Sequence, residues 1–166
     1  MKKFLLVMVA ALFVVTASAQ SAVKDAFGIN QSSKCSLGLR VGSGTYAVGE
    51  YFYAGDAYFE GRIGWEWKHG FNFTALHVWN IKDWNWTPNL GTWFFDAGAG
   101  AFVGAGYGEL NFGVAGTAKF GIFFKNVPIR LALDLTPKVG LCMHNGGIHF
   151  WDTGIFNSGF SVTYCF

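Results

Sequence analysis

Charged residues are scarce in this chain of 166 residues: Asp, Glu, Lys and Arg make up 13% of it, about half the share of an average globular protein. Proline is rarer still, with 3 residues. Low charge combined with 52% apolar residues excludes a disordered chain, a nucleic-acid-binding domain and a coiled coil. It also disfavours an ordinary soluble enzyme, because a soluble surface carries more charge.

The chain also lacks an apolar run long enough for a transmembrane helix, which needs about 20 residues. Its longest apolar run, Phe4 to Val15, follows Lys2 and Lys3 and precedes the small residues Ala17-Ser18-Ala19. A positive start, a short apolar core and small residues before the cleavage point are typical of a secretory signal peptide. The sequence therefore predicts an exported protein with a cleaved leader.

We predict three segments: a signal peptide over residues 1–19, a short periplasmic segment over 20–34 and one folded domain over 35–166. Removing Lys2 and Lys3 leaves ten basic and ten acidic residues. An exported chain without net charge has no evident polyanionic partner, and we expect no nucleic acid to bind.

What the chain does contain is a two-residue alternation of apolar and polar side chains, which is typical of a β-strand with one apolar face. It is clearest in Ile129–Leu141, where Ile and Leu alternate with Arg, Ala and Asp, and in Phe156–Phe166. Six further segments follow the same pattern: Cys35–Gly42, Ala47–Tyr53, Phe59–Trp67, Phe71–Trp79, Trp93–Gly104 and Leu110–Phe124.

Short Gly-containing turns separate most of these segments, and two connections are longer, Asn80–Thr92 and Cys142–Ile155. The order predicts an all-β fold of eight antiparallel strands in up-and-down sequence. In every predicted strand one face is free of Asp, Glu, Lys and Arg. The opposite faces carry five basic and five acidic residues: Arg40, Glu50, Glu60, Arg62, Glu66, Asp96, Lys119, Arg130, Asp134 and Lys138.

The many large side chains on the uncharged faces do not fit inside an eight-stranded barrel, whose interior is just wide enough to be filled by side chains. In a bilayer the apolar faces point to lipid and the balanced charges pair inside. Backbone groups in lipid are satisfied only in helices and closed barrels. The sequence therefore predicts a transmembrane β-barrel whose lumen is filled by a structural charge network, without an open pore.

Several segments resemble a group of small exported outer-membrane β-barrel proteins with the eight-stranded architecture of OmpA and OmpX. The similar stretches are Lys125–Pro137, Phe71–Trp79 and Asn89–Phe95. His77 and Val78 stand where that group carries Tyr and an acidic residue. The chain also ends with the alternation of an outer-membrane sorting signal, formed by Phe160, Val162, Tyr164 and Phe166.

The resemblance implies the outer membrane of a Gram-negative bacterium as the location, with both termini in the periplasm because the strand number is even. It implies outer-membrane lipids as partners, and the barrel-assembly machinery as the partner of the C-terminal strand. We expect a structural or surface-interaction role, with no cofactor and no enzymatic activity.

The longest outer connection is the first candidate for a surface partner, because loops on rigid scaffolds often carry function. Its interaction candidates are His144, His149, Phe150, Trp151 and Asp152. His144, His149 and Asp152 are also possible metal ligands, but two His residues five apart are a weak signal. We predict an exposed polar loop without a metal.

Two other functions stay open at this point. A lipid-modifying barrel enzyme would need a Ser, a His and a carboxylate at one rim, but His77 and Ser158 fall on different strands and no G-x-S-x-G motif is present. A soluble lipocalin-like barrel that binds a ligand is suggested by Gly91-Thr92-Trp93, although this motif opens the fifth predicted strand. We expect no disulfide between Cys35 and Cys165, because their strand phases point to opposite faces.

Overall fold

The computed structural model describes residues 34–144, 147–151 and 157–166. The predicted signal peptide, most of the predicted periplasmic segment and Asp152 lie outside these residues. Among the described residues no helix is long and apolar enough to cross a bilayer. All regular structure there is β, in ten strands: β1 Cys35–Gly42, β2 Gly44–Ala54, β3 Ala57–Glu66, β4 Gly70–Thr87, β5 Gly91–Gly106, β6 Glu109–Phe124, β7 Ile129–Leu135, β8 Lys138–His144, β9 Gly147–Trp151 and β10 Ser158–Cys165.

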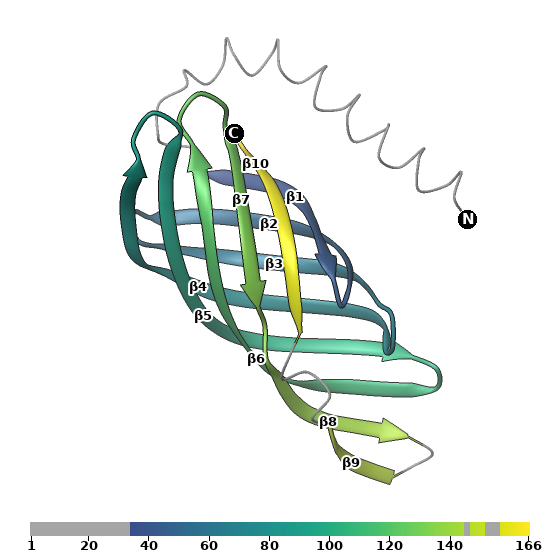
Figure 1. Ribbon diagram of the computed structural model, residues 1–166. Helices are drawn as coiled ribbons and strands as arrows, with labels where there is room; N and C mark the ends of the chain where they lie inside the picture. The colour runs from purple at the N-terminus through teal and green to yellow at the C-terminus, as the bar shows by residue number, and fades with distance from the viewer. Residues whose placement is uncertain (1–33, 145–146, 152–156) are drawn as a thin grey trace, which may run out of the picture. The chain divides into compact units, whose positions relative to one another are not determined.

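Eight of these strands close into a barrel with antiparallel pairing throughout (Figure 1). The ring runs β1–β2–β3–β4–β5–β6–β7–β10, and β10 pairs with β1 to close it. The predicted eight-stranded antiparallel barrel is confirmed. Strands β8 and β9 extend the wall beyond β6, because β8 pairs with the first half of β6 and β9 pairs with β8.

The predicted strand Ile129–Leu141 is interrupted at Thr136-Pro137, which separates β7 from β8. Proline has no N–H to donate to a neighbouring strand, so the ladder is broken there. The register against β6 is the same on both sides of the break, since Leu135 pairs with Ala118 and Lys138 with Ala115. Strands β7 and β8 therefore act as one long strand of the wall.

The strands are tilted, as the register shows. Pairing from Leu39 through β2, β3, β4, β5 and β6 reaches Leu141 on β8, whereas pairing from Leu39 through β10 reaches Leu131 on β7. One circuit therefore shifts the register by the ten residues from 131 to 141. For eight strands with ordinary spacings, this stagger corresponds to a tilt of about 40° from the barrel axis.

Two long connections predicted from the sequence are wrong, because both contain strand. The segment predicted as Asn80–Thr92 continues β4 to Thr87, so β4 and β5 form a hairpin that extends past the end of β3. The connection predicted as Cys142–Ile155 contains the end of β8 and all of β9. In the first segment apolar and polar residues alternate, but a register shift between Asn80 and Lys82 hides the pattern.

Candidate functional site

The interior of the barrel holds all ten charged residues that were placed on the polar strand faces. None of them exposes more than 8% of its surface. They come from β1, β2, β3, β5, β6, β7 and β8, so nearly every part of the wall contributes. A lone buried charge is strongly disfavoured unless it is paired and hydrogen-bonded, which makes the pairing decisive.

Eight of the ten charges form one continuous chain of ion pairs. Asp134 binds two guanidinium groups, with Arg40 Nη2 at 2.8 Å and Arg62 Nη1 at 3.4 Å from its Oδ1. Arg62 also pairs with Glu60, and Glu60 pairs with the Lys119 ammonium group. Positive and negative groups thus alternate from β1 to β6.

The chain continues from Lys119, whose ammonium nitrogen lies 3.0 Å from Glu50 Oε1. Glu50 Oε2 is 3.3 Å from Arg130 Nη1, and Arg130 pairs in turn with Asp96. Several of these pairs cross the lumen, because β2 and β6 stand four places apart in the ring of eight, as do β3 and β7. The network therefore ties opposite walls together.

The two remaining charges, Lys138 and Glu66, form their own pair at 2.5 Å. Asn157 connects this pair to the chain: its Nδ2 donates to Glu66 Oε1 at 3.1 Å, and its Oδ1 accepts from Arg40 Nη2 at 3.0 Å. Through this amide, all ten charges belong to one hydrogen-bonded network. The alternation in Phe156–Phe166 puts Asn157 on the polar face of its strand, but it does not indicate that Asn157 connects charged residues.

Uncharged groups complete the network, and sequence reasoning missed these as well. The Tyr46 and Tyr58 hydroxyls donate to Glu66 Oε1 at 2.6 Å and to Asp96 Oδ2 at 2.7 Å. The Arg130 guanidinium lies over the Phe94 ring, 3.9 Å from its centroid. Inner aromatic side chains therefore bind carboxylates by hydrogen bonds and cations by cation–π contacts. The sequence does contain a signal for these aromatic residues: Tyr46 and Phe94 are separated by an even number of residues from Glu50 and Asp96 on the same strands, which puts them on the same inner face.

One glycine makes room for this network. A Cβ atom on Gly159 would lie 2.5 Å from Arg40 Cζ, so the guanidinium packs directly against the backbone of β10. The sequence pattern also predicted that Gly98, Gly100 and Gly113 leave room for long side chains, and the structure corrects this. A Cβ atom there would meet the backbone of the neighbouring strand first, so these glycines permit close approach of strands.

The four outer-loop candidates within the described residues lie on a β-hairpin formed by β8 and β9 and not in a loop, which corrects the prediction; they are His144, His149, Phe150 and Trp151. His149 on β9 pairs with Cys142 on β8, and His144 pairs with Gly147. Phe150 is 69% exposed. Trp151 ends β9. Within the described part of the chain no group of three potential ligands is positioned to hold a metal ion.

The C-terminal candidates follow the predicted alternation. Phe160 and Val162 are exposed on the outer face of β10, and Tyr164 lies between them and the end of the strand. Strand β10 pairs along most of its length with both β1 and β7. Phe166 follows this strand. The segment of the predicted sorting signal is therefore the closing strand of the barrel.

The residues considered for enzymatic chemistry do not meet. His77 faces outward on β4, where its Nε2 is 2.5 Å from the Tyr53 hydroxyl. Ser158 begins β10, which stands opposite β4 in the ring. The three cysteines are free thiols: Cys35 is half-buried, and Cys142 and Cys165 are buried.

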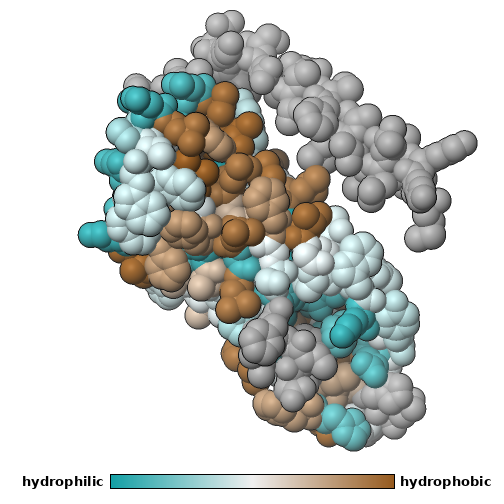
Figure 2. All heavy atoms as spheres, in the orientation of Figure 1, coloured by the Kyte–Doolittle hydropathy of each residue, from teal (hydrophilic) through white to brown (hydrophobic). Residues whose placement is uncertain are grey.

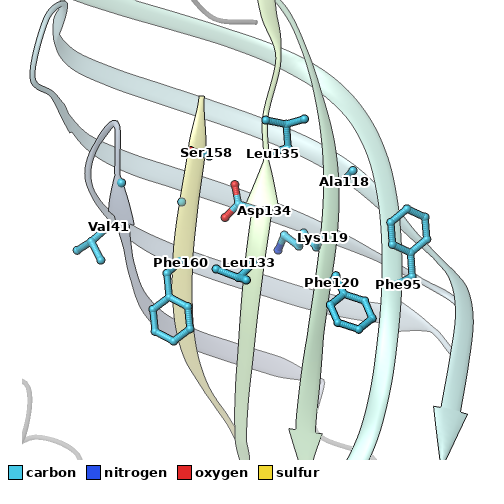
Figure 3. A pocket seen from close by; sticks show the side chains of 12 residues that line it. Val41, Phe95, Ala118, Lys119, Phe120, Leu133, Asp134, Leu135, Ser158 and Phe160 are labelled. Carbon is cyan, nitrogen blue, oxygen red and sulfur yellow. The ribbon is translucent and has the colours of Figure 1, made fainter. Parts of the chain in front are cut away.

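The outer wall carries a shallow hollow of about 540 Å³ (Figure 3). Outward-facing Phe95, Phe120, Leu133 and Phe160 border it, one from each of the neighbouring strands β5, β6, β7 and β10. Its surface is mainly apolar. Figure 2 shows the same property over the wall between the rims, where apolar side chains gather.

No family model matches the sequence, and no curated protein and no solved structure matches it significantly.

Proposed function

We propose that this chain is an integral outer-membrane β-barrel protein whose lumen is closed by its internal ion-pair network, with a structural or surface-interaction role. One observation carries the proposal: the barrel buries its charges inside and exposes its large apolar side chains outside. Among the exposed ones are Leu37 at 59%, Ile63 at 49% and Leu133 at 61%. This distribution is the reverse of that expected for a barrel surrounded by water.

The height of the apolar wall supports a membrane location. Outward residues from Leu131 to Leu141 are uncharged, and at a tilt of about 40° they extend about 25 Å along the barrel axis. The apolar band of transmembrane barrels is about 25 Å tall. The match favours lipid acyl chains as the surroundings of this wall.

Aromatic residues at both ends of the apolar wall give further support. Tyr51, Tyr53 and Trp79 are exposed near the end where β1 begins, and Trp65 and Trp67 near the opposite end. Transmembrane barrels carry such girdles at both interfaces. With termini in the periplasm, β10 would be the strand presented to the assembly machinery, and the β8–β9 hairpin would face the exterior.

The fold alone is equally compatible with a soluble barrel that binds a small ligand, so the test must separate these two functions. The full chain is expressed in a Gram-negative host, and its membranes are washed with alkaline carbonate. We expect the protein in the outer-membrane fraction, released only by detergent, and an electrophoretic band that shifts when the sample is boiled. Recovery in the soluble fraction without detergent contradicts the proposal and favours a ligand-binding barrel.

A further inference from the structure

A β-bulge in β4 turns one lysine onto the outer wall. Asn80 pairs with Asp96, but Lys82 pairs with Phe95, so Ile81 is an extra residue on β4. Before the bulge the odd-numbered residues of β4 face outward, and after it Lys82 and Trp84 do, up to a second register shift between Trp84 and Thr87. Lys82 therefore shares the outer face with Phe95 and is exposed. The sequence pattern did not predict this charge on the outer face.

Lys82 is distinguished from the other lysines of the described strands. Lys119 and Lys138 are buried and paired with carboxylates. Within the described part of the chain, the ammonium group of Lys82 forms neither an ion pair nor a hydrogen bond with the protein. A cation at the edge of an otherwise uncharged wall thus has no protein partner there.

An aromatic cluster adjoins Lys82 on the same face. Trp84 pairs with Trp93 across β4 and β5. The rings of Trp84 and Trp86 are stacked with centroids 5.2 Å apart, and Trp86 lies 5.9 Å from Trp93. Phe120 on β6 stacks on Trp93 at 5.5 Å. Trp86 remains 61% exposed, so the cluster presents an open aromatic surface beside the cation.

The cluster lies at the barrel end where β1 begins and β10 ends. The strand register puts Lys82 and the cluster at the same height on the barrel, because Phe120 pairs with Phe95 and Phe95 pairs with Lys82. Indole rings prefer the headgroup level of a bilayer, and a lysine there attracts anionic headgroups. A phospholipid with a phosphate beside Lys82 and its glycerol region on the indoles would complement both features.

We infer that Lys82, Trp84, Trp86 and Trp93 form a binding site for an anionic phospholipid headgroup at the terminal end of the barrel. This inference rests on the proposed membrane location. The Lys82 ammonium supplies the charge interaction. The exposed Trp86 ring and its stacked neighbour Trp84 cover the region between headgroup and acyl chains. The site selects a negatively charged headgroup over a zwitterionic one with the same acyl chains.

The test measures quenching of tryptophan fluorescence by brominated lipids. The full chain, with Trp65, Trp67 and Trp151 replaced by phenylalanine to silence reporters near the other end, is reconstituted in phosphatidylcholine vesicles. A minor fraction of brominated phosphatidylglycerol or brominated phosphatidylcholine is then included. We expect phosphatidylglycerol to occupy the site about fivefold more readily, and added salt to reduce this preference.

Variants locate the charge that is responsible. Lys82→Gln should abolish the preference, and Lys82→Arg should retain it. Lys68→Gln, in the turn at the opposite end of the barrel, is the matched control and should leave it unchanged. Two results overturn the inference: equal quenching by the two lipids when Lys82 is present, or a loss of the phosphatidylglycerol preference in Lys68→Gln as large as in Lys82→Gln. A chain that shows no heat-shifted band and no quenching by either lipid instead contradicts the proposed membrane location.

Discussion

Lys119 and Glu50 meet across the lumen, with the ammonium nitrogen 3.0 Å from Glu50 Oε1 although the residues stand 69 positions apart in sequence. They project from β6 and β2, which lie opposite each other in the ring. Both side chains are almost completely buried. This contact joins two walls that no backbone hydrogen bond connects, so the ion pairs act as internal cross-links of the barrel.

Removing one partner of this pair should therefore destabilise the barrel strongly. Lys119→Met leaves Glu50 and Glu60 buried with one cation fewer, and we expect a loss of about 3–5 kcal/mol in the free energy of unfolding. Glu50→Gln relieves part of the uncompensated charge. Urea unfolding of vesicle-reconstituted protein, followed by tryptophan fluorescence, measures both effects.

The double variant Lys119→Met/Glu50→Gln is the decisive comparison. If the two groups interact across the lumen, its loss should be smaller than the sum of the two single losses by about 1 kcal/mol or more. Strict additivity would show that the contact carries no coupling energy. Lys68→Met is the control, because it removes a lysine from an exposed turn.

Gly159 should tolerate no side chain, because the Arg40 guanidinium occupies the space that a Cβ atom needs. Gly159→Ala is expected to lower the free energy of unfolding by about 1–3 kcal/mol through overpacking. Gly61→Ala is the matched control, since a Cβ atom there meets nothing within 4 Å. Equal stability of the two variants in the same urea titration would mean that Arg40 moves aside without cost.

Local alternation was sufficient to predict the eight strands that close the barrel and the inward position of ten charged residues. Arg130 and Asp134, for example, occupy the polar phase of a clear alternating segment, and both are buried in the barrel. The barrel architecture could be predicted as well, because eight such segments joined by short turns close most simply by pairing each strand with the next in antiparallel order. The resemblance to small outer-membrane barrels pointed to the same architecture.

The partners inside the lumen were not predictable from that pattern. Whether Lys119 meets Glu50, Glu60 or Asp96 depends on the ten-residue stagger, which emerges only when all eight registers are combined. The bulge at Ile81 shifted the phase of β4 by one residue, and this hid both the length of the strand and the outward position of Lys82. A strand that contains one extra residue does not fit a single two-residue alternation, so the pattern ends at the bulge.

The three thiols should differ in reactivity. Cys35 is half-buried on the outer face, whereas Cys165 and Cys142 are buried with exposures of 5% and 7%. In the protein folded in detergent micelles, iodoacetamide is expected to modify Cys35 first, and all three thiols after denaturation. Peptide mass spectrometry quantifies each site. Early modification of Cys165 would place its side chain outside the barrel wall and contradict the inward phase of the end of β10.

The sharpest test of the environment of the wall is a charge placed on its apolar face. Leu133 is 61% exposed on β7, beside the outer hollow, so Leu133→Arg is sterically harmless. In lipid the arginine should destabilise the barrel by about 2–4 kcal/mol, whereas in water it should be nearly neutral. Tyr107→Arg, in the turn between β5 and β6 and 71% exposed, is the matched control beyond the apolar band. Folding into phosphatidylcholine vesicles at graded urea concentrations compares the two variants. Equal stability of both variants would mean that Leu133 does not face acyl chains. Something other than lipid would then have to cover the outward apolar wall.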